Sequence, residues 1–111
     1  MDRLEQYRNI IEKALSDNVL PQGRLVKTKD RTVFDRRSDN YLIVREGWDG
    51  PQHIHSCVVH LEIINDKIWV QEDWTEHGLA ADLEEAGIPK SDIVLGFQPA
   101  SVRPHTEYAV A

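Results

Sequence analysis

The feature that most constrains the fold is a two-residue turn between two strand-like segments. Asn65 and Asp66 separate a segment from His53 to Ile64 from a second segment, Lys67 to Asp73, and both alternate apolar and polar residues over much of their length. Asn and Asp tolerate the left-handed backbone that a two-residue hairpin turn requires. The sequence therefore predicts a β-hairpin here.

The turn also predicts the register of this hairpin. Once Ile64 is paired with Lys67, every following pair is fixed, because a slip of one residue would turn each side chain to the other face. The predicted pairs are Ile63 with Ile68 and Leu61 with Val70 on one face, and Glu62 with Trp69 and His60 with Gln71 on the other. One face is apolar and the other mostly polar, so Trp69 is expected to point outward, where either another part of the chain or a partner covers it.

Other segments predict two helices and further strands. Helical spacing of apolar residues predicts an N-terminal amphipathic helix with a buried stripe of Leu4, Tyr7, Ile11, Ala14 and Leu15. Two β-rich runs, 32–34 and 41–44, flank turn residues and predict another hairpin.

A second helix is expected after the Asn65–Asp66 hairpin. Thr75 is its predicted N-cap, and Gly87 stands where a C-terminal glycine stop belongs. The predicted buried stripe of this helix is Leu79, Leu83 and Ala86. The run 93–95 reads as a short strand. Together these elements predict an α+β fold, in which a largely antiparallel sheet of two hairpins, with about four to five strands, carries both helices on one face.

Size and composition are those of an ordinary globular protein. The chain has 111 residues, of which 41% are hydrophobic and 29% charged, so residues 1–111 are expected to form a single domain. No apolar run approaches the roughly 18 residues of a membrane span, and the N-terminus lacks the layout of a secretory signal. A cytoplasmic protein is expected. The single cysteine, Cys57, agrees with a reducing compartment.

The charge of the chain is unevenly distributed. The net charge is −6, yet the segment 24–37 has six basic and two acidic residues, which gives it +4 and leaves −10 on the remainder. The basic residues are Arg24, Lys27, Lys29, Arg31, Arg36 and Arg37. Such a segment is typical of a surface for an acidic partner or a phosphate backbone, and equally of an edge strand whose charges prevent sheet-to-sheet association.

Two clusters contain residue types used in metal or acid–base chemistry. His53, His55, Cys57 and His60 include the preferred ligands of zinc. However, strict alternation places His60 on the opposite face from the other three and places Cys57 beside Val59 in the core, so no metal site is expected. The acidic residues Glu72, Asp73 and Glu76 are explained by the partial positive charge at the start of the second helix.

Long ordered words in this sequence resemble the XisI family of cyanobacterial proteins. They are MDRLEQYRNII, TVFDRRSDNYLIVREGWDG, HLEIINDKIWVQEDWTEHGLAADLEEAGIPKSDIVLGF and the closing TEYAVA, and together they cover nearly the whole chain. Two departures are the segment 17–29, which matches no family word, and His77, where an acidic or neutral residue is expected.

The resemblance implies a biological process rather than a reaction. XisI proteins are named as controlling factors for excision of the fdxN element, a site-specific DNA rearrangement in nitrogen-fixing filaments, and act beside a recombinase and a companion protein, XisH. The family brings no catalytic residues, so neither enzymatic activity nor a cofactor is expected. The main hypothesis is a regulatory partner of an XisH-like protein.

Two other functions and an oligomeric state are also considered. The protein would instead be a DNA-binding accessory factor if the segment 24–37 contacts a duplex, or a metal-dependent hydrolase if His53, His55 and Glu72 form a site. The candidate interaction residues are the six basic residues of that segment together with Trp69. Edge strands and an outward tryptophan also favour a homo-oligomer.

Overall fold

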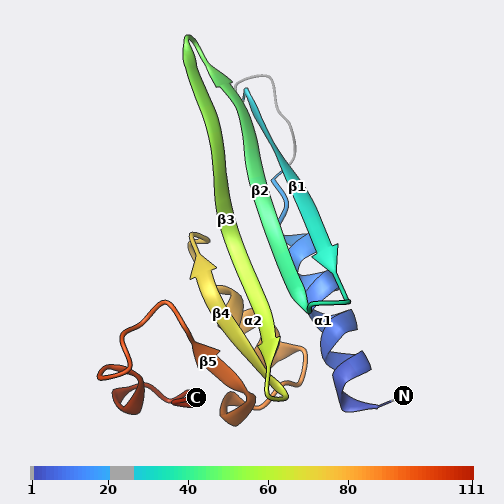
Figure 1. Cartoon of the computed structure of the whole chain (residues 1–111), viewed down its shortest axis with the longest axis vertical. Coiled ribbons are helices and arrows are strands. Elements are labelled where there is room, and N and C mark those ends of the chain that lie inside the picture. Colours follow the sequence, from blue (N-terminus) through green and yellow to red (C-terminus); the bar gives the residue numbers. More distant parts are fainter. Residues whose placement is uncertain (1, 21–26) are drawn as a thin grey trace.

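The structure, a computed structural model, describes residues 2–20 and 27–111. Its elements in chain order are α1 (Arg3–Asp17), β1 (Thr28–Asp35), β2 (Asn40–Asp49), β3 (Gln52–Ile64), β4 (Lys67–Asp73), α2 (Leu79–Glu85), the 3₁₀-helix η1 (Lys90–Asp92), β5 (Ile93–Leu95) and the 3₁₀-helix η2 (Arg103–His105). The strands form one sheet in the order β1-β2-β3-β4-β5. Strands β1 to β4 are antiparallel neighbours, and β5 pairs with β4 in parallel. The predicted α+β fold is confirmed (Figure 1).

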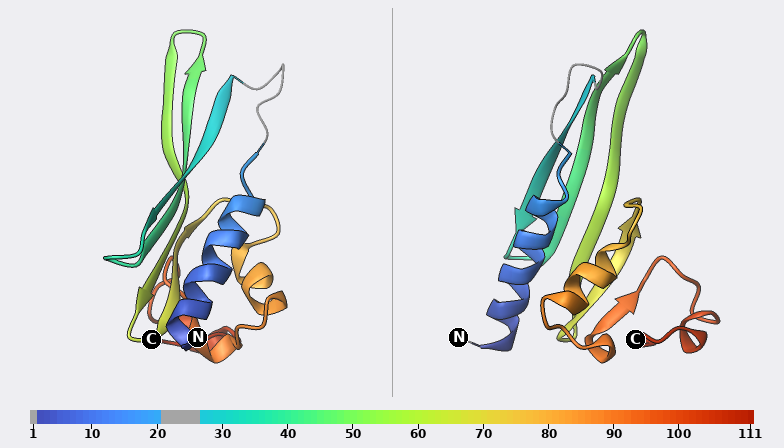
Figure 2. Two further views of the ribbon diagram at one scale, coloured as in Figure 1. Left: turned by 90° about the vertical axis from the view of Figure 1, so that its right-hand side faces the viewer. Right: turned by 180° about the vertical axis from the view of Figure 1, so that it is seen from behind.

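Both α-helices lie on one side of the sheet (Figure 2, left). Helix α1 begins at Arg3 because the Asp2 side chain caps it, accepting a hydrogen bond from the Glu5 amide at 2.8 Å. The predicted stripe of α1 is buried at Tyr7, Ile11, Ala14 and Leu15. These side chains pack against Tyr41, Ile43, Leu61, Ile68, Val70, Leu79 and Leu83 to form the core. Full burial of each valine, leucine or isoleucine side chain in this core contributes about 1.5–3 kcal/mol.

The Asn65–Asp66 hairpin has the predicted register for its first four pairs. Both turn residues have positive φ angles, 51° and 65°. The observed pairs are Ile64 with Lys67, Ile63 with Ile68, Glu62 with Trp69 and Leu61 with Val70. The prediction is wrong for His60, which pairs with Glu72 because a bulge at Gln71 adds one residue to β4.

Helix α2 is shorter than predicted and is capped differently. It begins at Leu79, and its N-cap is Gly78 rather than the expected Thr75. Gly78 has no side chain that could accept a hydrogen bond from the first turn. The Asp73 carboxylate at the end of β4 does so instead, accepting from the Leu79 amide at 2.6 Å and from the Thr75 amide at 2.9 Å. Ala86, predicted to be buried, is exposed at the end of the helix. Asp73 therefore holds the start of α2 through these hydrogen bonds.

The C-terminal segment folds back against the last strand of the sheet. Ala109 bridges to Val94, and its amide donates a hydrogen bond to the Ile93 carbonyl at 2.9 Å. Val94 is fully buried, although it is not part of the main core. The end of the chain therefore lies alongside β5 at this edge of the sheet. No helix among the described residues is long and apolar enough to cross a membrane.

Candidate interaction surface

Strands β2 and β3 form an arm that projects beyond the rest of the sheet (Figure 1). On one side, β1 begins at Thr28, opposite Gly47 of β2. On the other side, β4 pairs with β3 only from Val59 onward. The arm ends in the turn between Asp49 and Gln52 and is two-stranded there.

The sheet has one face that neither helix covers. We call it the outer face, and over β1 to β3 it carries alternate side chains of each strand, as directly paired residues lie on the same side. From the register its members are Lys29, Arg31, Val33, Asp35, Asn40, Leu42, Val44, Glu46, Trp48, His53, His55, Cys57, His60 and Glu62. Two of them expose large apolar side chains: Val33 is 40% exposed and Trp48 is 57% exposed. The outer face therefore combines apolar and polar side chains from three adjacent strands.

A bulge in β3 places all three histidines and the cysteine on the outer face. Val44 pairs with Cys57 whereas its neighbour Ile43 pairs with Val59, so Val58 is an extra residue. The prediction that His60 faces away from Cys57 and that Cys57 lies in the core is therefore wrong. On the two sides of the bulge, odd-numbered and even-numbered residues of β3 exchange the faces of the sheet to which they point. Val58 and Val59 are both buried, and Cys57 is only half-buried.

Sharing a face does not bring these four residues together. His53 and His55 have ring centroids 6.0 Å apart, and the His60 ring nitrogen Nε2 is instead 2.7 Å from the Asn40 Oδ1. Cys57 donates from Sγ to the Val59 carbonyl at 3.2 Å. In residues 2–20 and 27–111, no three His, Cys, Asp or Glu side chains are placed to hold a metal ion.

We expect the Cys57 thiol to react slowly. Burial and the neighbouring negative charge of Glu72 raise its pKa above the ordinary value, so little thiolate is present at neutral pH. Iodoacetamide at pH 7.5 should alkylate native Cys57 about tenfold or more slowly than the urea-unfolded chain, as followed by intact mass. Glu72→Gln should speed the native reaction. Equal rates in the native and unfolded chains would contradict this assignment.

The structure divides the basic segment between two sides of the molecule. Arg24 lies outside the described residues. Lys29 and Arg31 lie on the outer face, where the Arg31 guanidinium is 3.5 Å from Glu46. Arg36 turns instead toward α1, where it forms ion pairs of 2.7 Å with both Glu5 and Glu12.

Arg37 and Lys27 lie at opposite ends of β1. Arg37 is exposed in the turn between β1 and β2, whereas Lys27 immediately precedes β1 and borders a shallow hollow together with Lys29, Trp48 and His53. The Trp48 and His53 rings pack at a centroid distance of 4.6 Å. Lys27 and Lys29 thus lie beside the exposed Trp48 ring.

Trp69 points to the outer side of the sheet as predicted, and the chain itself covers it. The Arg103 guanidinium lies over the Trp69 ring, 5.0 Å from its centroid, and Trp69 is half-buried. The more exposed tryptophans are Trp48 and Trp74, the latter at 75%. The signal that would have identified Trp48 is its place beside the tip of a hairpin, in the word GWDG.

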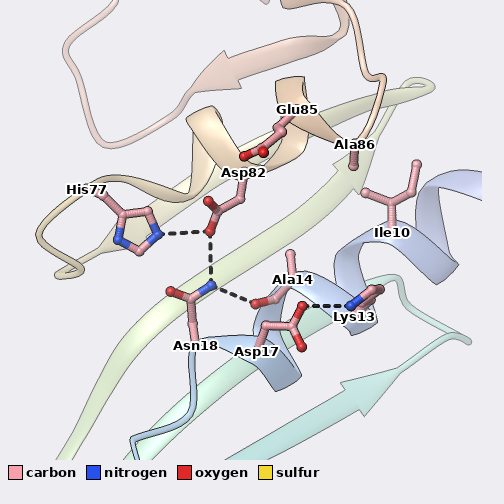
Figure 3. A pocket seen from close by; sticks show the side chains of 9 residues that line it. All are labelled: Ile10, Lys13, Ala14, Asp17, Asn18, His77, Asp82, Glu85 and Ala86. Carbon is pink, nitrogen blue, oxygen red and sulfur yellow. Dashed lines mark hydrogen bonds and ion pairs between the residues drawn. The ribbon is translucent and has the colours of Figure 1, made fainter.

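A second hollow lies between the two helices (Figure 3). His77 and Asn18 both approach the Asp82 carboxylate, with Nε2 and Nδ2 at 2.9 and 3.0 Å from its Oδ2. The hydrogen bond to Asp82 raises the pKa of His77. His77, in the loop before α2, therefore shares the Asp82 carboxylate with Asn18 at the end of α1.

Comparisons with known proteins agree on one family. The model of the XisI protein family matches residues 1–110. The crystal structure of the fdxN element excision controlling factor XisI from Anabaena variabilis is similar with a TM-score of 0.79 and 36% identity, over 99% of this chain and 100% of that one. A XisI-like protein from Anabaena variabilis has the same TM-score and 33% identity, over 96% of this chain and 94% of that one. No curated protein matches the chain.

Proposed function

Because the chain belongs to the XisI family, we propose that it is a non-catalytic controlling factor for excision of the fdxN element and acts by binding an XisH-like protein. The similar structure from Anabaena variabilis bears the name of such a factor. The observation that carries the proposal is the outer face, which no helix covers and which continues into the arm with Trp48 near its tip.

The composition of the outer face suits a protein partner. Exposed aromatic side chains are common anchors of protein interfaces, and the same face carries an apolar strip of Val33, Leu42 and Val44, which Glu46 separates from Trp48 along β2. The face carries charges of both signs, and one basic residue is paired within it, as the Arg31 guanidinium lies 3.5 Å from Glu46. A net charge of −6 also opposes a large contact with nucleic acid.

Replacing Trp48 should weaken the proposed complex most. An anchor residue at the centre of an interface contributes at least about 2 kcal/mol, which corresponds to roughly 30-fold in the dissociation constant. We therefore expect Trp48→Ala to weaken binding of the neighbouring XisH-like protein by that factor, measured by calorimetry at low salt. Trp74→Ala is the matched control and should change the affinity by less than about twofold. No association of the wild-type proteins, or equal losses in both variants, would reject the proposal.

A second candidate function is direct binding of duplex DNA by the arm. The observation in its favour is the stacked Trp48–His53 pair beside Lys27 and Lys29. It requires duplex affinity that falls steeply with salt and is lost in Lys27→Ala/Lys29→Ala. Arg36→Ala is a useful contrast, since its ion pairs with α1 make it a structural residue. Salt-independent binding of the XisH-like protein without duplex affinity would favour the first function.

A further inference from the structure

Part of β3 has a backbone edge with no neighbouring strand. Strand β3 runs over 13 residues, but β4 leaves it after Asp73, and the last contact is the Trp74 amide donating to the Val58 carbonyl at 3.0 Å. From Gln52 to Cys57, β3 pairs with β2 on one side and with none of the described strands on the other. Figure 1 shows this open side of the arm above β4. Outward backbone groups along such an edge are ready to pair with another strand.

The open edge of β3 lacks the charges that usually protect an edge strand. Its sequence, QHIHSC, contains no Asp, Glu, Lys, Arg or Pro. The opposite edge of the sheet, β1, carries Lys29, Asp30, Arg31 and Asp35 within eight residues. Proteins commonly use such charges to prevent edge-to-edge association. The two edges of the sheet thus differ: β1 is protected and β3 is not.

We propose that the open edge of β3 pairs antiparallel with the same edge of a second copy of this chain. The segment 52–57 is neutral, so two copies of it can pair without bringing like charges together. Pairing of this segment with the β1 edge of another copy would instead bury charged side chains of β1. The contact is two-fold symmetric and closes after two copies, so it does not lead to filaments. It joins two sheets into one and satisfies the exposed backbone groups of both strands.

The register of the pairing follows from the faces of the sheet. Directly opposed residues lie on the same face, so outer-face residues of one copy meet outer-face residues of the other. In the two registers that pair most of the edge, His55 lies opposite His53 or His55 of the second copy. Both outer faces then lie on the same side of the joined sheet. The dimer is independent of the proposed XisH-like partner, although it would present two copies of the outer face to it.

Sedimentation velocity of the full chain tests the proposal without any other component. We expect a species of twice the 12.8 kDa chain mass at micromolar concentration. His53→Glu/His55→Glu should weaken the dimer more than about 100-fold, because opposed like charges in a contact cost several kcal/mol. His53→Lys/His55→Lys should do the same. An equimolar mixture of the two variants should recover the dimer, because opposite charges then face each other in either register.

Recovery of the dimer in the mixture would show that each variant alone has lost only the contact between copies and is still folded. Val33→Glu adds a charge to the exposed β1 edge and should leave the dimer intact. A wild-type chain that stays monomeric up to about 100 µM, a mixture that stays monomeric, or a Val33→Glu variant that dissociates as readily as the histidine variants would overturn the proposal. Binding of the XisH-like protein by a monomeric wild type would overturn the dimer and leave the proposed function standing.

Discussion

Replacing Tyr41 by alanine is expected to lower the free energy of unfolding by about 3–5 kcal/mol, as for other large aromatic residues removed from a core. Tyr41 is fully excluded from solvent and lies near the start of β2 on the face toward the helices. It pairs with Leu61 across β3 and contacts the Phe34 ring at a centroid distance of 6.0 Å. Loss of the ring leaves a cavity among three strands that the surrounding backbone cannot close. Urea unfolding followed by circular dichroism measures the change.

Tyr41→Phe is the matched variant, since it keeps the ring and removes only the hydroxyl group. That hydroxyl donates to the Asp39 Oδ1 at 2.8 Å, and the same carboxylate accepts from Arg8 at 2.8 and 3.2 Å. The ion pair with Arg8 holds the pKa of Asp39 below its ordinary value. We expect Tyr41→Phe to cost about 0.5–1.5 kcal/mol. Equal losses in the two variants would show that the hydroxyl network, and not ring burial, holds this part of the core.

The sequence predicted this core well wherever local rules determine the structure. The Asn65–Asp66 turn fixes the register of the pairs next to it, because both residues accept positive φ angles. Apolar residues at helical spacing identified the buried side of α1 for a similar reason. These predictions depend only on short segments whose period is uninterrupted.

The predictions failed where a bulge interrupts the period of a strand. One extra residue at Gln71 moved the partner of His60, and another at Val58 moved Cys57 out of the predicted core. Alternation of apolar and polar residues does not reveal such an insertion in advance. The adjacent apolar residues Val58 and Val59 are the one local irregularity at the β3 bulge. The histidines and the cysteine were consequently assigned to different faces, although all lie on the outer face.

The net charge of a sequence segment does not predict which side of the sheet its charges lie on. The segment 24–37 was treated as one basic unit, but alternate residues of a strand face opposite sides. Asp30 lies on the helix side, where Arg45 holds it at 2.8 Å, and Arg36 is held by α1. The pairing of these charges depends on elements distant in sequence, so no local pattern predicts it. The exposure of Trp48 likewise follows from where β1 begins and β4 ends.

Replacing Gly47 by alanine is expected to be the most damaging change at the base of the arm. A β-carbon at this position would lie 2.4 Å from the Lys27 carbonyl oxygen and 2.8 Å from the Thr28 Cα, and the φ angle of Gly47 is +155°. Both contacts are with backbone, so β1 must move away from β2. Overpacking and backbone strain each cost about 1–3 kcal/mol. Thermal unfolding measures the total, and amide exchange at 28–30 shows where the sheet opens.

Gly50→Asn at the tip of the same arm provides the contrast. Gly50 has a φ angle of +60° and no atom within 4 Å of the added β-carbon, and asparagine tolerates that conformation. We expect a change in stability within about 0.5 kcal/mol and unaltered exchange at 28–30. Because a β-carbon at Gly47 would push against Lys27 and Thr28, its replacement should also move Lys27 and Lys29 away from Trp48. Similar stability and exchange in both variants would mean that β1 does not depend on the close approach at Gly47.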